Sequence, residues 1–286
     1  MPRSQAVDPR WATRARRART LLADRPHTEP LLQFYVSLLE LQTAVCVPLE
    51  VDRWLPVVEA SGADAPPLQL ERLPLAELSP SFAAFCRGMP ETAPEPVAQA
   101  ADAVSGVGEA IRVDLLLAML TGSNNDRAAC TLGCAPAPLA FLSRGFLSPI
   151  AEALAGAVSS PTGDTRAPVC PRCGWPPQVS RLKDEPDALG NRRLVCALCA
   201  TAWTFPRAAC PACGVSGDQG LEFHVDEGLA HVRVEACKTC RCYLKSVDLR
   251  VIGFAEPLVD DLATPELDLW AAEQGLEKIA PNLLGL

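Results

Sequence analysis

Eight of the 13 cysteines in this 286-residue sequence stand in four C-x-x-C pairs. Two thiolates three positions apart lie on one tight turn, whose backbone N–H groups can bond the sulfurs, and two such turns facing each other form a tetrahedral four-sulfur site. Four pairs within about 70 residues therefore predict two metal centres. The pairs are Cys170 and Cys173, Cys196 and Cys199, Cys210 and Cys213, and Cys237 and Cys240.

The spacing of the pairs predicts how they combine. Cys170 and Cys210 lie 40 residues apart, Cys196 and Cys237 lie 41 apart, and CPRCG is repeated as CPACG. We therefore expect a duplicated module, in which the first two pairs hold one ion and the last two pairs hold another. An interleaved arrangement, in which the first pair joins the third, would produce the same set of cysteines and stays open.

Both iron and zinc accept four thiolates, so the ligands predict two ions per chain without selecting the metal. Zinc is favoured by the affinity order among divalent ions, whereas iron would allow a site to change oxidation state. The 85 residues from 166 to 250 offer little apolar core to two modules. Bound metal should therefore contribute to folding, at about 10–16 kcal/mol for a structural site.

The residues after each pair predict the shape of the turns. Gly174 and Gly214 suit turns with positive φ, whereas Ala200 and Arg241 occupy the matching positions of the second knuckles and should be tighter or strained there. Alternating segments around residues 192–195 and 229–235 predict strands that enter the second knuckles. Each module should have a rubredoxin-like or zinc-ribbon fold.

No enzyme signature accompanies these cysteines. The sequence lacks a complete dinucleotide fingerprint, a Walker loop, an HExxH motif and a nucleophile elbow. Four thiolates also saturate each predicted site and leave no open position for substrate. We therefore expect no catalytic residue, and we assign structural or surface roles to the three histidines, which are His27, His224 and His231.

The five other cysteines receive no ligand role. Cys46 and Cys86 lie in apolar helical stretches and should be packed thiols. Cys130 and Cys134 have no second pair or histidine near them in sequence, and Cys242 should be a spare exposed thiol.

Residues 1–165 have the pattern of helices separated by prolines, which predicts a helical bundle or irregular helical domain. Apolar residues recur at helical spacing from Trp11 to Leu22, and Arg10, Arg14 and Arg17 line another face of the same helix. That arginine stripe is either a solvated face or a docking surface for acidic groups. Further helices are expected at residues 30–45, from Ser79–Pro80 onward, at 107–121 and at 138–158.

The end of the sequence returns to helix after a Ser/Pro/Gly-rich linker at residues 158–168 and the cysteine modules. Thr264–Pro265 should open the last helix and Gly275 should close it. Residues 251–286 hold seven acids and one base, so this tail either docks on the arginine-rich first helix or is a solvated acidic end.

These segments predict an α+β multidomain protein, with a mostly α-helical N-terminal domain, two tandem rubredoxin-like or zinc-ribbon modules and a C-terminal helix. The expected domains are residues 1–165, helical; 166–206, the first four-cysteine module; 207–250, the second four-cysteine module; and 251–286, the acidic helical tail.

Charge and hydropathy restrict the function. The module segment holds 12 bases and nine acids, which could suggest nucleic-acid binding, but eight thiolates on two divalent ions add four negative charges and remove that basic excess. Apolar runs fall short of the roughly 20 residues that span a bilayer, and no apolar core of a signal peptide follows Arg16–Arg17. We therefore expect a cytoplasmic protein whose cysteines are not disulfides.

At these residues the sequence resembles the formate dehydrogenase accessory protein FdhE family. The similarity is carried by CPRCGWPP, by RRLVCALCATAW running into RAACPACG, by VEACKTCRCYLK, and by VDDLATPELDLWAAEQG before Pro281–Asn282. It is strong from Cys170 onward and weaker over the helical domain. Ala202 stands where an acidic residue is expected, and Arg241 stands where glycine is expected.

The resemblance implies a cytoplasmic assembly factor, with iron-binding rubredoxin-like modules, that contacts the catalytic subunit of respiratory formate dehydrogenase before export. Two other functions stay open. A rubredoxin-like electron carrier should cycle iron reversibly, and a zinc-ribbon protein that binds nucleic acid should do so with steep salt dependence.

Overall fold

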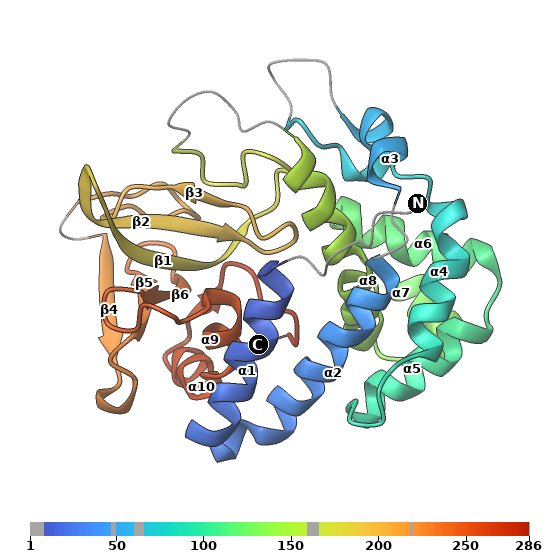
Figure 1. Cartoon of the computed structure of the whole chain (residues 1–286), viewed down its shortest axis with the longest axis horizontal. Coiled ribbons are helices and arrows are strands. Elements are labelled where there is room, and N and C mark those ends of the chain that lie inside the picture. The colour runs from blue at the N-terminus through green and yellow to red at the C-terminus, as the bar shows by residue number, and fades with distance from the viewer. Residues whose placement is uncertain (1–8, 47–49, 60–65, 159–165, 218–219, 286) are drawn as a thin grey trace.

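The computed structural model describes residues 9–46, 50–59, 66–158, 166–217 and 220–285. Helices make up the N-terminal region and a single sheet with short helices makes up the C-terminal region (Figure 1), which confirms the predicted α+β class. The domain limits at residues 165, 206 and 250 stay predictions. One sheet continues across residues 206 and 250, so it does not divide the chain at either position.

The N-terminal region contains eight α-helices within the described residues. They are α1 (Pro9–Asp24), α2 (Glu29–Cys46), α3 (Val51–Val58), α4 (Leu75–Arg87), α5 (Glu95–Gly106), α6 (Glu109–Thr121), α7 (Asp126–Leu132) and α8 (Pro136–Ala157). Gly122 ends α6 at a φ of 68°, as the sequence predicted.

Helix α8 forms the centre of this region. It is buried on nearly all sides, as expected for a helix enclosed by others, and it packs against α2, α4, α5 and α6. Phe146 of α8 contacts Phe82 and Phe85 of α4 with ring centroids 5.2 and 5.8 Å apart. These aromatic contacts fix α4 against α8.

The predicted start of one helix was wrong. Helix α4 begins at Leu75, one turn before Ser79–Pro80, and Pro80 lies inside it. Leu75 and Leu78 in that added turn are buried, so their packing outweighs the hydrogen bond that a proline lacks. Ser79 does not cap the helix, because its Oγ accepts a hydrogen bond from Arg112 Nε at 2.8 Å.

The C-terminal region is built on seven strands in the order β3-β2-β1-β6-β5-β4, with β7 beside β6. Their bounds are β1 (Pro177–Glu185), β2 (Ala188–Cys196), β3 (Ala202–Thr204), β4 (Leu221–Val225), β5 (Val232–Cys237), β6 (Cys242–Asp248) and β7 (Glu277–Lys278). Strands β1 and β6 pair in parallel, with Val179 beside Lys245, and this pairing joins the two cysteine segments in one sheet.

Two short helices connect the sheet with the N-terminal region. They are α9 (Pro257–Leu262) and α10 (Pro265–Glu273). Thr264 and Gly275 bound α10 as predicted, and Gly275 has a φ of 66°. Helix α9 packs against α1 on one side and against β1 and β6 on the other (Figure 1).

Two of the three arginines in the stripe of α1 belong to a docking surface, whereas Arg10 is exposed. Arg14 and Arg17 are buried and form ion pairs with Glu152 at 2.8 Å and Asp260 at 2.5 Å. Arg25, just after α1, pairs with Glu266 of α10. The interpretation in which the acidic tail docks on the arginine-rich helix is therefore confirmed.

Candidate metal centres

The first centre lies where two loops meet at one end of the sheet. Cys170 and Cys173 stand in the loop before β1, Cys196 is the last residue of β2, and Cys199 stands in the turn between β2 and β3. The Sγ atoms are 3.6 Å apart for Cys170 and Cys199, 3.5 Å for Cys173 and Cys196, and 3.4 Å for Cys173 and Cys199. Four sulfurs held about 2.3 Å from one ion would lie about 3.8 Å apart, so the quartet is close to the size of a tetrahedral metal site.

The second centre repeats this arrangement around β4 and β5. Cys210 and Cys240 have their Sγ atoms 3.7 Å apart, and so do Cys213 and Cys237. The structure thus groups the cysteines in the tandem order and not in the interleaved one. All four cysteines of the first centre are buried, whereas Cys213 is exposed and Cys240 is half-buried.

Backbone amides of the knuckles point at the sulfurs. The amide of Arg172 donates to Cys170 Sγ at 3.5 Å, that of Leu198 to Cys196 Sγ at 3.4 Å, and that of Ala212 to Cys210 Sγ at 3.4 Å. These donors stabilise negative sulfur, which is the form that binds metal.

The turns differ in strain as the sequence predicted. Gly174 and Gly214 both have a φ of 76°. Ala200 and Arg241 occupy the left-handed region as well, with φ values of 53° and 61°, at a cost for residues that carry a Cβ. Arg241 gains a partner there, because its guanidinium donates to the carbonyl of Gln274 at the end of α10.

The thiols of each centre cannot all ionise without a cation. In the first centre, hydrogen bonds from the neighbouring thiols lower the pKa of Cys170, while burial raises the pKa of Cys196. In the second, burial raises the pKa of Cys210 to about 12; backbone amides outweigh burial at Cys237 and hold its pKa at about 7. A divalent ion is the group that would let four thiolates coexist.

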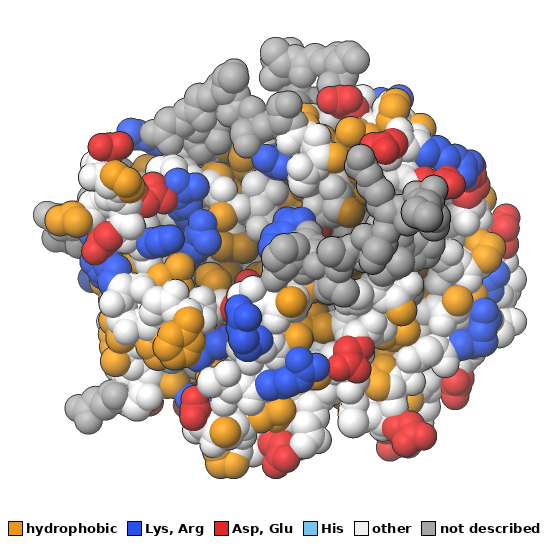
Figure 2. Space-filling view, in the orientation of Figure 1, with side chains coloured by type: hydrophobic (Ala, Val, Ile, Leu, Met, Phe, Trp, Pro, Cys, Tyr) orange, Lys and Arg blue, Asp and Glu red, His pale blue; other side chains and the backbone are white. Residues whose placement is uncertain are grey.

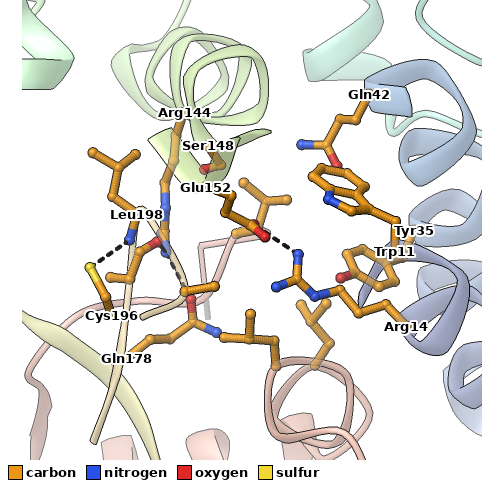
Figure 3. A pocket seen from close by; sticks show the side chains of 15 residues that line it. Trp11, Arg14, Tyr35, Gln42, Arg144, Ser148, Glu152, Gln178, Cys196 and Leu198 are labelled. Atoms are coloured by element: carbon orange, nitrogen blue, oxygen red, sulfur yellow. Dashed lines mark hydrogen bonds and ion pairs between the residues drawn. The ribbon is translucent and has the colours of Figure 1, made fainter. Parts of the chain in front are cut away.

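A buried arginine connects the first centre to the helical region (Figure 3). Arg144 of α8 donates to the carbonyl of Ala197, inside the second knuckle, at 2.7 Å, and to Gln178 Oε1 at 2.8 Å. It also donates to the carbonyls of Pro281 and Asn282 at 2.7 and 2.9 Å. Burial lowers its pKa to about 10, although the carboxylate of Asp261 favours the charged guanidinium.

A match to a family of known proteins covers both centres. Residues 169–207 match the family model described as "FdhE, central domain", and residues 209–284 match "FdhE, C-terminal domain". The solved structure titled "The crystal structure of the FdhE protein from Pseudomonas aeruginosa" superposes with a TM-score of 0.73 at 26% identity, over 96% of this chain and 94% of that one. The chain is thus similar to FdhE proteins in sequence over these C-terminal residues and in structure over most of its length.

Curated FdhE relatives match about half of the chain or less. "Protein FdhE homolog" of Aquifex aeolicus (strain VF5) is 37% identical over 147 residues, which are 51% of this chain and 52% of that protein. The protein of the same name from Stutzerimonas stutzeri (strain A1501) is 38% identical over 117 residues, which are 41% of this chain and 38% of that protein. The chain thus spans about half or less of the length of these FdhE relatives.

Residues that sequence reasoning missed form a charged core beside the centres. Lys245 and Lys278 lie between the carboxylates of Asp261 and Asp268, with Nζ to oxygen distances of 2.6 to 2.9 Å. Burial raises the pKa of Asp261, but the two ammonium groups outweigh it and hold that pKa below its usual range. The sequence offers one local sign of buried charge, which is a charged residue inside an apolar run, as in FLSRGFLSP around Arg144. A charged residue in such a run is expected to have a buried partner.

The remaining predicted residues, with the exception of Cys242, have the roles expected of them where the structure describes them. Cys86 is a packed thiol whose pKa burial raises to about 12, and the side chain of Cys46 lies outside the described residues. Cys130 is exposed and Cys134 is half-buried. The prediction of an exposed thiol at Cys242 was wrong, because this thiol is half-buried and donates to the carbonyl of Cys240 at 3.7 Å. His231 binds Asp260 at 2.8 Å, His224 stacks on Trp270 at 3.7 Å between ring centroids, and His27 is exposed. No described helix combines the length and apolar character that crossing a bilayer requires.

Proposed function

We propose that the chain is an assembly factor for formate dehydrogenase, which binds the catalytic subunit of that enzyme in the cytoplasm and does not oxidise formate itself. Similarity to the FdhE family models over residues 169–207 and 209–284 supports the accessory role. The observation that carries it is the pair of tetracysteine clusters, because each would saturate its ion with four thiolates and leave no position for substrate.

Each cluster is proposed to hold one iron or zinc ion. The ligands would be Cys170, Cys173, Cys196 and Cys199 in the first centre, and Cys210, Cys213, Cys237 and Cys240 in the second. The sulfur separations and the knuckle amides fit such an ion. When bound, the ion would cross-link the knuckles, and iron could also exchange an electron.

Electron transfer is the second candidate function, and the exposure of the second centre favours it. Cys213 is exposed and Cys240 is half-buried, so an ion there would lie near the molecular surface. A carrier needs that proximity, whereas a purely structural ion does not. The two functions differ in the ion that they need. A redox-inert ion such as zinc would suffice for an assembly factor, whereas an electron carrier needs iron.

The test is capture of the catalytic subunit by the full chain loaded with zinc or with iron, under air and under anoxia. We expect both forms to capture the subunit, because both ions accept tetrahedral thiolate ligation at similar distances. Cys199→Ser should lose one of two ions per chain and fail to capture it, whereas Cys130→Ser, which changes an exposed cysteine on α7, should do neither.

Two results would contradict the proposal. Failure of both metal forms to capture the subunit in either atmosphere would reject the assembly role and favour electron transfer. Equal metal content in Cys199→Ser and Cys130→Ser would remove Cys199 from the ligands.

A further inference from the structure

A pocket of about 370 Å³ opens between the beginning of α1 and the face of β1, β2 and β3. This is within the size range of about 300–1,000 Å³ that small-molecule sites occupy. Arg10, Arg14 and Arg181 line it together with a single carboxylate, Glu256. Figure 2 shows Lys and Arg side chains on this face, over β1 and β2 and at the beginning of α1.

Arg181 is the cation that the fold leaves available. Arg14 is engaged by Glu152 at 2.8 Å and Glu256 at 3.7 Å, but Arg181 has no ion pair or side-chain hydrogen bond among the described residues. Its Nε is buried without a partner. The unpaired Nε destabilises the folded chain. Solvent does not reach this atom, so the donors open to an acceptor from outside the chain are the terminal guanidinium nitrogens of the half-buried side chain.

The pairing of β1 with β2 adds to this cost. Arg181 lies directly opposite Arg193 on the neighbouring strand, and like charges in that position repel each other. Glu185 forms its ion pair with Arg193 at 2.7 Å, so Arg181 is attracted by Glu185 and Glu256 only over longer distances. Burial and the charge of Arg193 outweigh that attraction and lower the pKa of Arg181, so the folded chain alone disfavours the charge at residue 181.

The rest of the pocket is apolar apart from Thr13, and it adjoins the first metal centre. Val195 and Ala200, which flank the knuckle of Cys196 and Cys199, form one wall. The other apolar lining residues are Ala202, Leu249, Ala255, Pro257 and Leu258. A ligand that fits must combine an anionic group for the arginines with an apolar body for these walls.

We propose that this pocket binds a small organic anion, in which a carboxylate or phosphate is attached to a short apolar body. The planar guanidinium of Arg181 has the fork geometry that binds either group through two parallel hydrogen bonds. The apolar body lies against Val195, Leu249 and Leu258. This inference does not depend on the proposed function of the metal centres.

The test is calorimetric titration of the full metal-loaded chain with four probes, which are hexanoate, hexyl phosphate, hexanol and inorganic phosphate. We expect at least one organic anion to bind with 1:1 stoichiometry below about 10 mM. Hexanol, which lacks the charge, and inorganic phosphate, which lacks the apolar body, should bind at least about tenfold more weakly.

Matched variants locate the binding. Arg181→Gln should weaken binding of the organic anion at least about tenfold, since it removes a charged hydrogen-bond donor. Lys183→Gln removes the same charge from an exposed position two residues along β1, outside the pocket, and should change affinity less than about twofold. Arg181→Lys keeps the charge without the fork and should give an intermediate affinity. The midpoint temperature of thermal unfolding should not be lower for Arg181→Gln than for the wild type.

Several outcomes overturn the inference. The first is that neither organic anion releases or absorbs heat on titration. The second is that Arg181→Gln binds the organic anion as tightly as the wild type does. The third is that hexanol binds as tightly as the organic anions. Binding of inorganic phosphate as tight as that of hexyl phosphate would also contradict it, because the apolar walls would then have no part in recognition.

Discussion

Arg17 of α1 and Asp260 of α9 form a buried two-pronged ion pair across 243 residues of sequence. Nε of Arg17 lies 3.0 Å from Asp260 Oδ2, and Nη2 lies 2.5 Å from Oδ1. The same carboxylate accepts hydrogen bonds from His231 at 2.8 Å and from the amide of Glu256. One side chain of the tail therefore fixes α1, the loop before β5 and the beginning of α9 together.

Asp260→Asn should destabilise the chain by about 3–5 kcal/mol, because it leaves Arg17 buried without a counter-charge. Glu40→Gln is the matched control, since Glu40 pairs with Arg19 on the surface and that change should cost less than about 1 kcal/mol. Urea unfolding of the metal-loaded proteins measures both. Equal unfolding midpoints in the two variants would show that the Arg17 pair does not hold α1 in place.

The stability difference between wild type and Asp260→Asn should depend on pH. Burial alone raises the pKa of Asp260, but hydrogen bonds from His231 and Arg17 outweigh it and hold that pKa below its ordinary value of 3.8. A depressed carboxyl pKa contributes stability that is complete above the unfolded value and is lost as the pH falls through the folded value. The difference should therefore be constant above about pH 5 and shrink below pH 3.8. A difference that grows on acidification would contradict this assignment.

The second centre should lose its metal before the first. Every cysteine of the first centre is buried, whereas Cys213 is exposed, so a chelator reaches the second centre without local unfolding. We expect release of two ions in two phases of equal amplitude. Cys213→Ser should abolish the fast phase and Cys173→Ser the slow one. Release in a single phase from the wild type would indicate that burial does not control access.

The knuckle glycines should differ in their tolerance of a side chain. Gly214→Ala adds a Cβ with no atom within 4 Å, so it should cost only the backbone strain of a positive φ, about 1–2 kcal/mol. Gly174→Ala has the same φ of 76°, but its Cβ would lie 3.0 Å from Cγ of Pro66, and it should cost more. Thermal unfolding of the metal-loaded variants compares them. A larger loss in Gly214→Ala would refute the steric argument.

Arg144→Gln should weaken the first centre selectively. The variant leaves the carbonyls of Ala197 and Pro281 without their donor, at about 1–3 kcal/mol for each buried group. We expect faster metal release from the first centre and an unchanged rate from the second. Arg127→Gln, on the exposed face of α7, is the control and should leave both rates unaltered. Acceleration of both phases would show a general loss of stability and not a contact specific to the first centre.

Local patterns predicted the features that depend on near neighbours in sequence. The C-x-x-C spacing identified the cysteines of each cluster because one turn carries both sulfurs, and Thr264 and Gly275 marked α10 because caps act within one turn. The parallel pairing of β1 with β6 was not predicted, since Val179 and Lys245 carry no local sign of each other. The partners of Arg144 were missed for the same reason.

The contacts of α1 with the tail can form only late in synthesis of the chain. Arg17 emerges from the ribosome 243 residues ahead of Asp260, which at about 5–20 residues per second is a delay of roughly 10–50 s. During that interval α1 cannot bury its arginines against the tail, because a guanidinium enters the protein interior only with its counter-ion. Helix α1 therefore stays accessible to chaperones and proteases until α9 has been made.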